Sequence, residues 1–399
     1  MRKAEDLNGH LQGPWSFLTP HEILYGDGAL GRLTDKLPQM GSKALVVTDA
    51  MMVRLGNVER VGEVLDRAGV AYEVFDEVNG EPTDAMVRTG ERMFRSCGCD
   101  FMVALGGGSP IDTMKAIALV VGGGGEISSY MGAVSERPVC PMVAVPTTAG
   151  TGSEATQFTI ITDTERGVKM LIAGPSLIPH TAVVDPAFTL TAPPSVTVAT
   201  GLDALCHAIE SYTSRKAHPL SETFSLSAAR RIFDNLATCV REPGNVAART
   251  QMSLAATEAG IAFNNSSVTL IHGMSRPIGA LFHVPHGLSN AMLMDVCLAF
   301  ALDGAPERFA RIARYCGIST SQADGEAAGA LLRAIRGLLV ELEVPTLAEF
   351  GVAREDYFGA IDKMVDDAVQ SGSPANTMRD VCPDDLRMLY AKAYDRGEC

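Results

Sequence analysis

Short β-branched segments alternate with helical segments through the first half of the chain, and this alternation constrains the fold more than any other feature. Apolar runs at 43–50, 71–78 and 101–108 predict three buried strands. The segments 58–69 and 83–98 between them have helical spacing and end at glycine. Because strands joined by helices run parallel, we expect a parallel sheet with helices on both faces.

The pattern changes near residue 190. Before it, alternating Thr, Ile and Val residues in 158–172 predict a β-hairpin or a pair of edge strands. After it, the chain is almost wholly helical in pattern, with Ala, Leu, Glu and Arg dominant. A chain of 399 residues is too long for one ordinary core. We therefore predict an α/β domain over 1–188 and an all-α domain over 189–399.

The composition excludes several classes of partner. The formal net charge is −14 and the chain has no run of Lys or Arg, which excludes a nucleic-acid surface. No stretch approaches the roughly 20 apolar residues of a membrane span, and the first residues lack the apolar core of a signal peptide. We expect a cytoplasmic protein that binds a small molecule.

Four side chains of the second half have the chemistry of a metal site. Asp203 and His207 are four residues apart in a helical pattern, so one helical face presents a carboxylate and an imidazole together. His272 and His286, each beside a glycine, can complete a nitrogen-rich shell that suits iron or zinc better than calcium or magnesium. On a helix, the intervening Cys206 points roughly 100° away from His207, so we interpret it as structural.

The strand predicted at 101–108 runs into Gly106, Gly107 and Gly108, which are followed by Ser109 and a helix with proline in its first turn. Glycines let the backbone approach a pyrophosphate, and a helix N-terminus supplies free N–H groups and the positive end of the dipole. The same residues also suit a strand-to-helix turn without a ligand, and they lack the GxGxxG spacing of an ordinary Rossmann motif.

Two further loops at strand ends favour a bound dinucleotide. Asp49 follows the first strand, where a carboxylate can accept hydrogen bonds from an adenosine ribose and repel the 2′-phosphate of NADP. Thr147, Thr148 and Thr151 supply hydroxyls in the second loop. Alternatively, Asp49 caps a helix and the threonines cap a turn.

Four motifs in the chain resemble those of one protein family in their order and spacing. They are GGGSPIDTMKAIA, PTTAGTGSEAT, ATGLDALCHAIESY and HGMSRPIGALFHVPHG. With these motifs, the chain resembles the iron-containing, or group III, alcohol dehydrogenase family over nearly its whole length. The resemblance implies the dehydroquinate synthase-like fold of that family. Its parts are an N-terminal α/β dinucleotide-binding domain, a helical metal-binding domain and an active site in the interdomain cleft.

The resemblance also implies roles for individual residues. The residues that match the family's metal ligands are Asp203, His207, His272 and His286. Those that match the pyrophosphate and nicotinamide loop are Gly107, Gly108, Ser109 and Asp112, and a second cofactor loop matches Thr147, Thr148 and Thr151. Lys169 resembles a lysine that reaches the nucleotide ribose. Asp49 resembles the acidic residue associated with NAD preference, with NADP as the alternative.

These roles imply an NAD(P)-linked alcohol dehydrogenase or aldehyde reductase. We expect hydride transfer between a metal-bound alkoxide and C4 of the nicotinamide, with one divalent metal as the Lewis acid. The resemblance favours Fe²⁺, and Zn²⁺ is the alternative because three nitrogens and one carboxylate also suit it. Family members are often dimers or larger assemblies. The segment 22–30 offers a strand edge for pairing, so we expect a homodimer or a larger homo-oligomer.

Arg276 departs from the family pattern. Many members have a histidine there that is implicated in proton transfer, but an arginine does not release its proton at ordinary pH. Arg276 can instead pair with a carboxylate or phosphonate of the substrate, or it can be a structural residue tied to a helix terminus or an acidic neighbour. His283 is the alternative proton relay, and it equally suits a surface position.

Three other activities are open. If Arg276 binds an anionic group of the substrate, the enzyme is a dehydrogenase for a hydroxy acid, of the 4-hydroxybutyrate type, and not one for neutral alcohols. Related architecture also serves polyol dehydrogenases and dehydroquinate synthase, whose metal sites resemble one carboxylate with two histidines. The fourth ligand candidate, His207, therefore favours the alcohol dehydrogenase branch.

Overall fold

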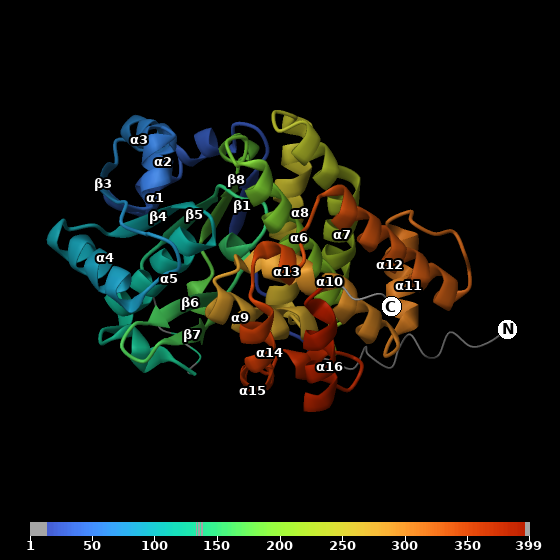
Figure 1. The fold of residues 1–399 in the computed structure, drawn as a ribbon. Helices are drawn as coiled ribbons and strands as arrows, with labels where there is room; N and C mark the ends of the chain where they lie inside the picture. The colour runs from blue at the N-terminus through green and yellow to red at the C-terminus, as the bar shows by residue number, and fades with distance from the viewer. Residues whose placement is uncertain (1–13, 133, 135, 137–138, 396–399) are drawn as a thin grey trace. The chain divides into compact units, whose positions relative to one another are not determined.

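The computed structural model describes residues 14–132, 134, 136 and 139–395 (Figure 1). These residues form two compact units. An α/β unit contains residues 18–193 and 244–260. A helical unit contains the described residues of 14–17, 194–243 and 261–395.

Within the described residues, six parallel strands form the sheet of the α/β unit, in the order β1-β8-β5-β4-β2-β3. Their bounds are Glu22–Tyr25 (β1), Lys43–Val47 (β2), Ala71–Phe75 (β3), Phe101–Gly106 (β4), Met142–Pro146 (β5) and Thr181–Val184 (β8). The three strands predicted from the apolar runs are confirmed as β2, β3 and β4, and each ends slightly earlier than predicted.

Neighbouring residues of each strand pack on opposite faces of the sheet. Leu45 of β2 lies in one core cluster and the next residue, Val46, lies in another. Helices α4 (Asp84–Ser96) and α5 (Gly108–Gly123) cover the first face, and α3 (Asn57–Arg67) covers the second (Figure 1). Because both faces are covered, the central strands are apolar at nearly every position, and the parallel pairing of the strands confirms the predicted parallel sheet.

The remaining elements of the α/β unit are short. They are η2 (Ala29–Leu33), α1 (Leu37–Met40), α2 (Ala50–Arg54), η3 (Ile127–Tyr130), η4 (Ser153–Ala155), β6 (Phe158–Asp163), β7 (Val168–Ala173), η5 (Pro175–Leu177) and η6 (Pro186–Phe188). Strands β6 and β7 pair antiparallel, so of the two arrangements predicted for 158–172, a β-hairpin or a pair of edge strands, the structure has the hairpin.

The helical unit is built around a long buried helix, α6. The helices of the second half are α6 (Pro194–Tyr212), α7 (Pro219–Arg241), α8 (Val246–Asn265), α9 (Leu270–Phe282), α10 (His286–Leu302), α11 (Pro306–Tyr315), α12 (Asp324–Glu341), α13 (Leu347–Phe350), α14 (Arg354–Gly359), α15 (Ile361–Gln370), η7 (Pro374–Asn376) and α16 (Pro383–Ala393). Every residue of α6 from 201 to 212 is buried, as in a helix that lies at the centre of a core. None of the helices in the described residues has the length and apolarity needed to cross a membrane.

Two glycines join the first part of helix α8 to the α/β unit. A Cβ added at Gly152 would lie 2.5 Å from Cα of Gly260, so neither position tolerates a side chain. On the same helix, Thr257 donates a hydrogen bond of 2.6 Å to the buried carboxylate of Glu154. Residues 244–260, which the helical pattern placed in the 189–399 domain, therefore belong to the α/β unit. The placement of the active site in an interdomain cleft stays a prediction.

Candidate metal centre and nucleotide pocket

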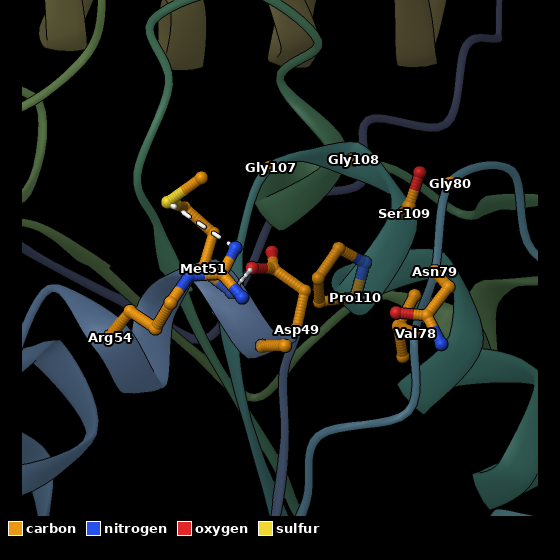
Figure 2. A pocket seen from close by; sticks show the side chains of 11 residues that line it. Asp49, Met51, Arg54, Val78, Asn79, Gly80, Gly107, Gly108, Ser109 and Pro110 are labelled. Carbon is orange, nitrogen blue, oxygen red and sulfur yellow. Dashed lines mark hydrogen bonds between the residues drawn. The ribbon is translucent and has the colours of Figure 1, made fainter.

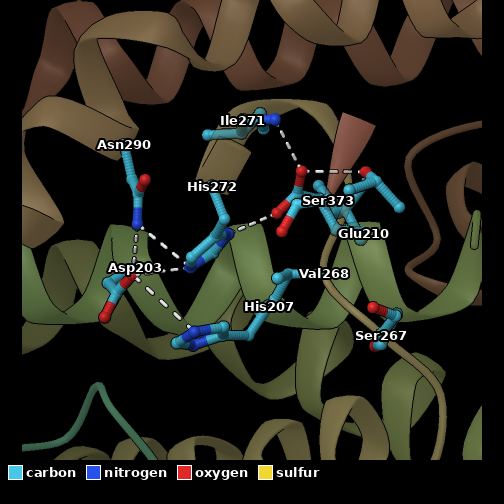
Figure 3. Close-up of polar contacts among 12 residues, drawn as sticks. Asp203, His207, Glu210, Ser267, Val268, Ile271, His272, Asn290 and Ser373 are labelled. Atoms are coloured by element: carbon cyan, nitrogen blue, oxygen red, sulfur yellow. Dashed lines mark hydrogen bonds and ion pairs between the residues drawn. The ribbon is translucent and has the colours of Figure 1, made fainter. Parts of the chain in front are cut away.

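Helix α6 aligns three titratable side chains on one face. Asp203, His207 and Glu210 occupy positions i, i+4 and i+7, and all three are buried (Figure 3). The sequence predicted the first two as metal ligands on a shared helical face. Glu210 was not predicted, although its spacing of three residues from His207 is a signal that could have identified it.

His272 and His286 approach Asp203 from two other helices. His272 lies in the first turn of α9, and His286 is the first residue of α10. Nε2 of His272, His286 and His207 lie 3.4, 3.8 and 4.0 Å from Oδ1 of Asp203. The ligand atoms of Asp203, His207 and His272 all lie within 4.8 Å of one another. The structure therefore brings the four predicted ligands together.

The glycine that follows His286 permits this approach. A Cβ at Gly287 would lie 2.3 Å from the carbonyl oxygen of Ala199 on α6, so the two helices are in backbone contact. This contact places the start of α10 beside Asp203. The side chain of His286 is 47% exposed, whereas those of Asp203 and His272 are buried.

The separations fit a small divalent cation. Two atoms that each lie about 2.1 Å from one metal ion are at most about 4.2 Å apart. The three distances from Oδ1 of Asp203 meet this condition. The donor set of one carboxylate oxygen and three imidazole nitrogens suits iron or zinc.

Glu210 orients the imidazole of His272. One carboxylate oxygen, Oε2, accepts a hydrogen bond from Nδ1 of His272, and Oε1 accepts from the hydroxyl of Thr269 at 2.8 Å and the N–H of Ile271 at 2.7 Å. Because a carboxylate only accepts, Nδ1 carries a hydrogen and Nε2 is turned toward Asp203. Such pairs of carboxylate and histidine fix the ring orientation of metal ligands.

Burial and neighbouring charge set the protonation of the ligands. Burial raises the pKa of Asp203, but the imidazoles of His207, His286 and His272 outweigh it and hold this pKa well below its usual range. Burial lowers the pKa of His207 to about 3, so this ring is neutral. Burial also lowers the pKa of His272, but Glu210 and Asp203 outweigh it and raise this pKa to about 9. A cation that binds at Nε2 of His272 therefore displaces a proton.

Arg276 lies one turn after His272 on α9 and is partly buried. Its Nη1 donates a hydrogen bond of 3.3 Å to the hydroxyl of Ser373, and among the described residues it forms no ion pair. His283 is the exposed, left-handed C-cap of α9, with φ of 54°. The catalytic roles of Arg276 and His283 stay predictions. Cys206 is buried, and burial raises the pKa of its thiol, consistent with a structural residue.

The glycine-rich loop of the α/β unit lines a pocket of about 480 Å³ (Figure 2). Gly107, Gly108 and Ser109 lie on one side of it, with Asp49 and Arg54 on another. Gly107 is also the N-cap of α5, and no side chain of the described residues caps this helix end. The first N–H groups of a 16-residue helix are thus free to bind an anion such as a pyrophosphate.

The two predicted cofactor loops are in contact. A Cβ at Gly108 would lie 3.1 Å from the side chain of Thr151, and one at Gly107 would lie 3.4 Å from the hydroxyl of Thr148. The N–H of Thr147 donates a hydrogen bond of 3.0 Å to the carbonyl of Gly106. The glycines therefore leave room beside the threonine loop that side chains would fill, as expected for a nucleotide cradle.

Three other predicted cofactor residues have partners within the protein. Asp49 lines the pocket, and its carboxylate also caps α2 by accepting from two backbone N–H groups. Asp112 accepts a hydrogen bond from the hydroxyl of Ser153. Lys169 forms an ion pair of 2.6 Å with Glu81. The contact of Asp112 with a nicotinamide and that of Lys169 with a ribose stay predictions.

Two sequence profiles of known protein families match the chain, and together they cover most of both units. The sequence profile described as iron-containing alcohol dehydrogenase matches residues 20–186. The profile of the C-terminal part of the Fe-containing alcohol dehydrogenase family matches residues 197–394. The chain belongs to the iron-containing alcohol dehydrogenase family. It is therefore an oxidoreductase for alcohols or aldehydes, as the four motifs predicted.

Similar members of the iron-containing alcohol dehydrogenase family have differing substrates. The NAD-dependent methanol dehydrogenase of Bacillus methanolicus is 37% identical over 371 residues, which span 92% of this chain and 97% of that protein. A crystal structure of 1,3-propanediol oxidoreductase is 33% identical with a TM-score of 0.92, and the match covers 96% of this chain and 100% of that one. A structure of sulfoacetaldehyde reductase from Bifidobacterium kashiwanohense in complex with NAD⁺ is 28% identical, with a TM-score of 0.86 and coverages of 96% and 99%. Family membership alone therefore does not fix the substrate.

The contact between Glu210 and His272 leads to a prediction for metal affinity. Glu210→Gln should weaken Zn²⁺ binding by about 10–100-fold, because an amide does not hold the Nδ1 hydrogen as a carboxylate does. Competition with a chromophoric chelator measures this affinity. The exposed Glu341→Gln on α12 is the matched control and should bind Zn²⁺ like the wild type. Equal affinities of all three proteins would show that Glu210 does not orient His272.

Proposed function

We propose that this family member transfers hydride between a small alcohol or aldehyde and NAD. One divalent metal ion, Fe²⁺ or alternatively Zn²⁺, is held by Asp203, His207, His272 and His286. The observation that carries the proposal is the convergence of these side chains around Oδ1 of Asp203. The NAD in the names of two similar proteins and the carboxylate of Asp49 in the pocket support NAD over NADP.

The residues of this chain have distinct tasks in that reaction. When bound, the metal supplies Lewis acidity toward an alcohol hydroxyl, and the nicotinamide accepts the hydride. Asp203 supplies the negative charge that offsets the cation, the neutral ring of His207 supplies a lone pair, and Glu210 holds His272. The glycine loop and the start of α5 bind the pyrophosphate.

The test is turnover with and without metal. Purified protein loaded with Fe²⁺ or Zn²⁺ should form NADH from a panel of short alcohols, and NADP⁺ should be the poorer acceptor. Metal-free protein should bind NAD⁺ but should not turn over. NADH formation at the full rate after chelation, with the absence of metal verified by elemental analysis, would refute the role of the metal.

A second candidate substrate class is an aldehyde or alcohol with an anionic group, bound by Arg276. A partly buried guanidinium that is hydrogen-bonded to a neutral hydroxyl and forms no ion pair within the described residues favours this class. Sulfoacetaldehyde reductase, whose substrate name denotes a sulfonate, is among the similar structures. Since Arg276 does not act as a base, His283 is the proposed proton relay.

Arg276 can be tested by comparing a charged and a neutral substrate. A charge-assisted hydrogen bond contributes about 1.5–3 kcal/mol, so Arg276→Gln should lower kcat/KM for 4-hydroxybutyrate by about 10–150-fold relative to 1-butanol. Arg276→Lys keeps the positive charge, so its kcat/KM for 4-hydroxybutyrate should fall less than that of Arg276→Gln. An equal change for both substrates would eliminate the anion-binding role.

The protein is further proposed to act in the cytoplasm as a homodimer or a larger homo-oligomer. Strand β1 is an edge of the sheet, and Tyr25 at its end is 64% exposed, so its backbone is available for pairing with a second copy. Sedimentation velocity measures the assembly, and a monomer at micromolar concentration would exclude it.

A further inference from the structure

Asn290 contacts three of the four proposed metal ligands. It lies on α10, one turn after His286, and is fully buried. Its amide nitrogen lies 2.7 Å from Oδ1 of Asp203, 3.1 Å from Nε2 of His272 and 3.3 Å from Nε2 of His286. Figure 3 shows the amide directed at Asp203 and His272. One NH₂ group thus contacts three atoms that are turned toward the proposed metal.

Hydrogen-bond chemistry determines which end of the amide faces the ligands. The oxygen of Asp203 only accepts. Metal binding requires the neutral form of His272, in which the Nδ1 hydrogen is engaged with Glu210 and Nε2 presents a lone pair. The two hydrogens of the amide nitrogen suit these acceptors, whereas the amide oxygen would face acceptors alone. The nitrogen therefore points into the cluster.

This orientation leaves the amide oxygen unsatisfied. Within the described residues, Oδ1 of Asn290 is buried and has no hydrogen-bond partner, which is unfavourable. The contacts with the three ligands therefore hold the amide in place against this penalty. In the deprotonated form that binds a metal, the carboxylate of Asp203 and the lone pairs of the two imidazoles would face one another and repel if no donor lay at this position.

We propose that Asn290 is a positioning residue that holds Asp203, His272 and His286 in their metal-binding arrangement before the metal binds. Its amide nitrogen donates to Oδ1 of Asp203 and lies within hydrogen-bond distance of Nε2 of both imidazoles, the atoms that a cation contacts, so it supplies part of the attraction that the metal provides later. The close approach of α10 to α6 at Gly287 brings the amide within reach of Asp203. This inference rests on the proposed function, in which these side chains bind a metal.

The test measures Zn²⁺ affinity in metal-free protein by competition with a chromophoric chelator. We expect Asn290→Leu and Asn290→Ala to bind Zn²⁺ about 10–100-fold more weakly than the wild type, the range for residues that orient metal ligands. Ser289→Ala is the matched control on the same turn and should bind normally, because its hydroxyl donates to the backbone carbonyl of His286. The alanine variant, which adds no atoms, carries the test if the leucine variant fails to fold.

Melting temperatures with and without Zn²⁺ separate positioning from general stability. A positioning role predicts that the increase caused by Zn²⁺ is smaller in the Asn290 variants than in the wild type. A purely structural role would lower both melting temperatures equally and leave that increase unchanged, which would overturn the inference. Wild-type affinity in a folded Asn290 variant would overturn it as well. Failure of the wild-type protein itself to bind Zn²⁺ would contradict the proposed function and this inference with it.

Discussion

The His272→Ala protein should bind NAD⁺ like the wild type but oxidise alcohols about 10³-fold more slowly. The change removes one ligand atom from the cluster around Asp203 and leaves the buried carboxylate of Glu210 without its imidazole partner. A metal Lewis acid contributes several kcal/mol to such a reaction, and each 1.36 kcal/mol is about a tenfold change in rate. Nucleotide binding should persist, because Asp49 and the glycine loop belong to the α/β unit and His272 belongs to the helical unit.

Three measurements on the same preparation test this expectation. Elemental analysis gives the metal content, NADH absorbance gives the turnover, and quenching of protein fluorescence gives NAD⁺ affinity. The matched control is His21→Ala, which removes an exposed imidazole of the α/β unit and should change none of the three. Wild-type turnover by a His272→Ala protein that contains no metal would contradict the proposed mechanism.

The sheet was predictable because strands that are buried on both faces consist of continuous apolar runs, which can be recognised in the sequence. Strands such as β2 and β4 are apolar at nearly every position, and the helices between them start and end with recognisable signals. Helical periodicity, in contrast, indicates which face of a helix is buried. It does not indicate whether that face packs on the core of the α/β unit or on that of the helical unit. Residues 244–260 therefore looked like the rest of the helical half, and contacts such as those of Gly260 with Gly152 and of Thr257 with Glu154 assign them to the α/β unit.

The metal ligands were predictable from residue type, whereas the residues that orient them were not. Asp203 and His207 are common ligand types at a spacing that shares a helical face. Glu210 follows the same spacing on the same helix, so its omission was avoidable. Asn290 is not a usual ligand type, and its contacts with Asp203 and His272 arise from packing between helices that no local pattern encodes.

A buried charge network beside the glycine loop was also missed. Asp112 was assigned to the cofactor by resemblance, but its carboxylate is hydrogen-bonded to Ser153, whose hydroxyl also accepts from Lys115. Lys115 is fully buried on α5. Its ammonium donates hydrogen bonds of 2.8 Å and 2.9 Å to the carbonyls of Thr156 and Phe158. This single cation thus joins α5 to the loop that leads into β6.

Lys115→Met should therefore destabilise the protein by about 3–5 kcal/mol, the range for leaving buried polar and charged groups without their partner. Methionine fills the space of the lysine stem, but the two backbone carbonyls lose their donor and Asp112 loses its neighbouring cation. The free energy of unfolding from denaturant titration measures the effect. Lys36→Met, which breaks a surface pair with Glu22, is the control and should cost at most about 1 kcal/mol. A loss at Lys115 as small as that of the control would show that its hydrogen bonds do not stabilise the fold.

The difference in the free energy of unfolding between the wild type and Lys115→Met should also depend on pH, which provides an independent test of the environment of Lys115. Burial lowers the pKa of Lys115 from 10.5 to about 8. Between these two pH values the unfolded chain binds more protons at this residue than the folded chain does, so the lysine makes the free energy of unfolding rise with pH. Methionine does not titrate, and the other titrating groups are the same in both proteins. The stability difference between wild type and Lys115→Met should therefore grow from pH 8 to pH 10.5. A stability difference that stays constant from pH 8 to pH 10.5 would mean that the folded protein does not lower the pKa of Lys115, although this side chain is fully buried.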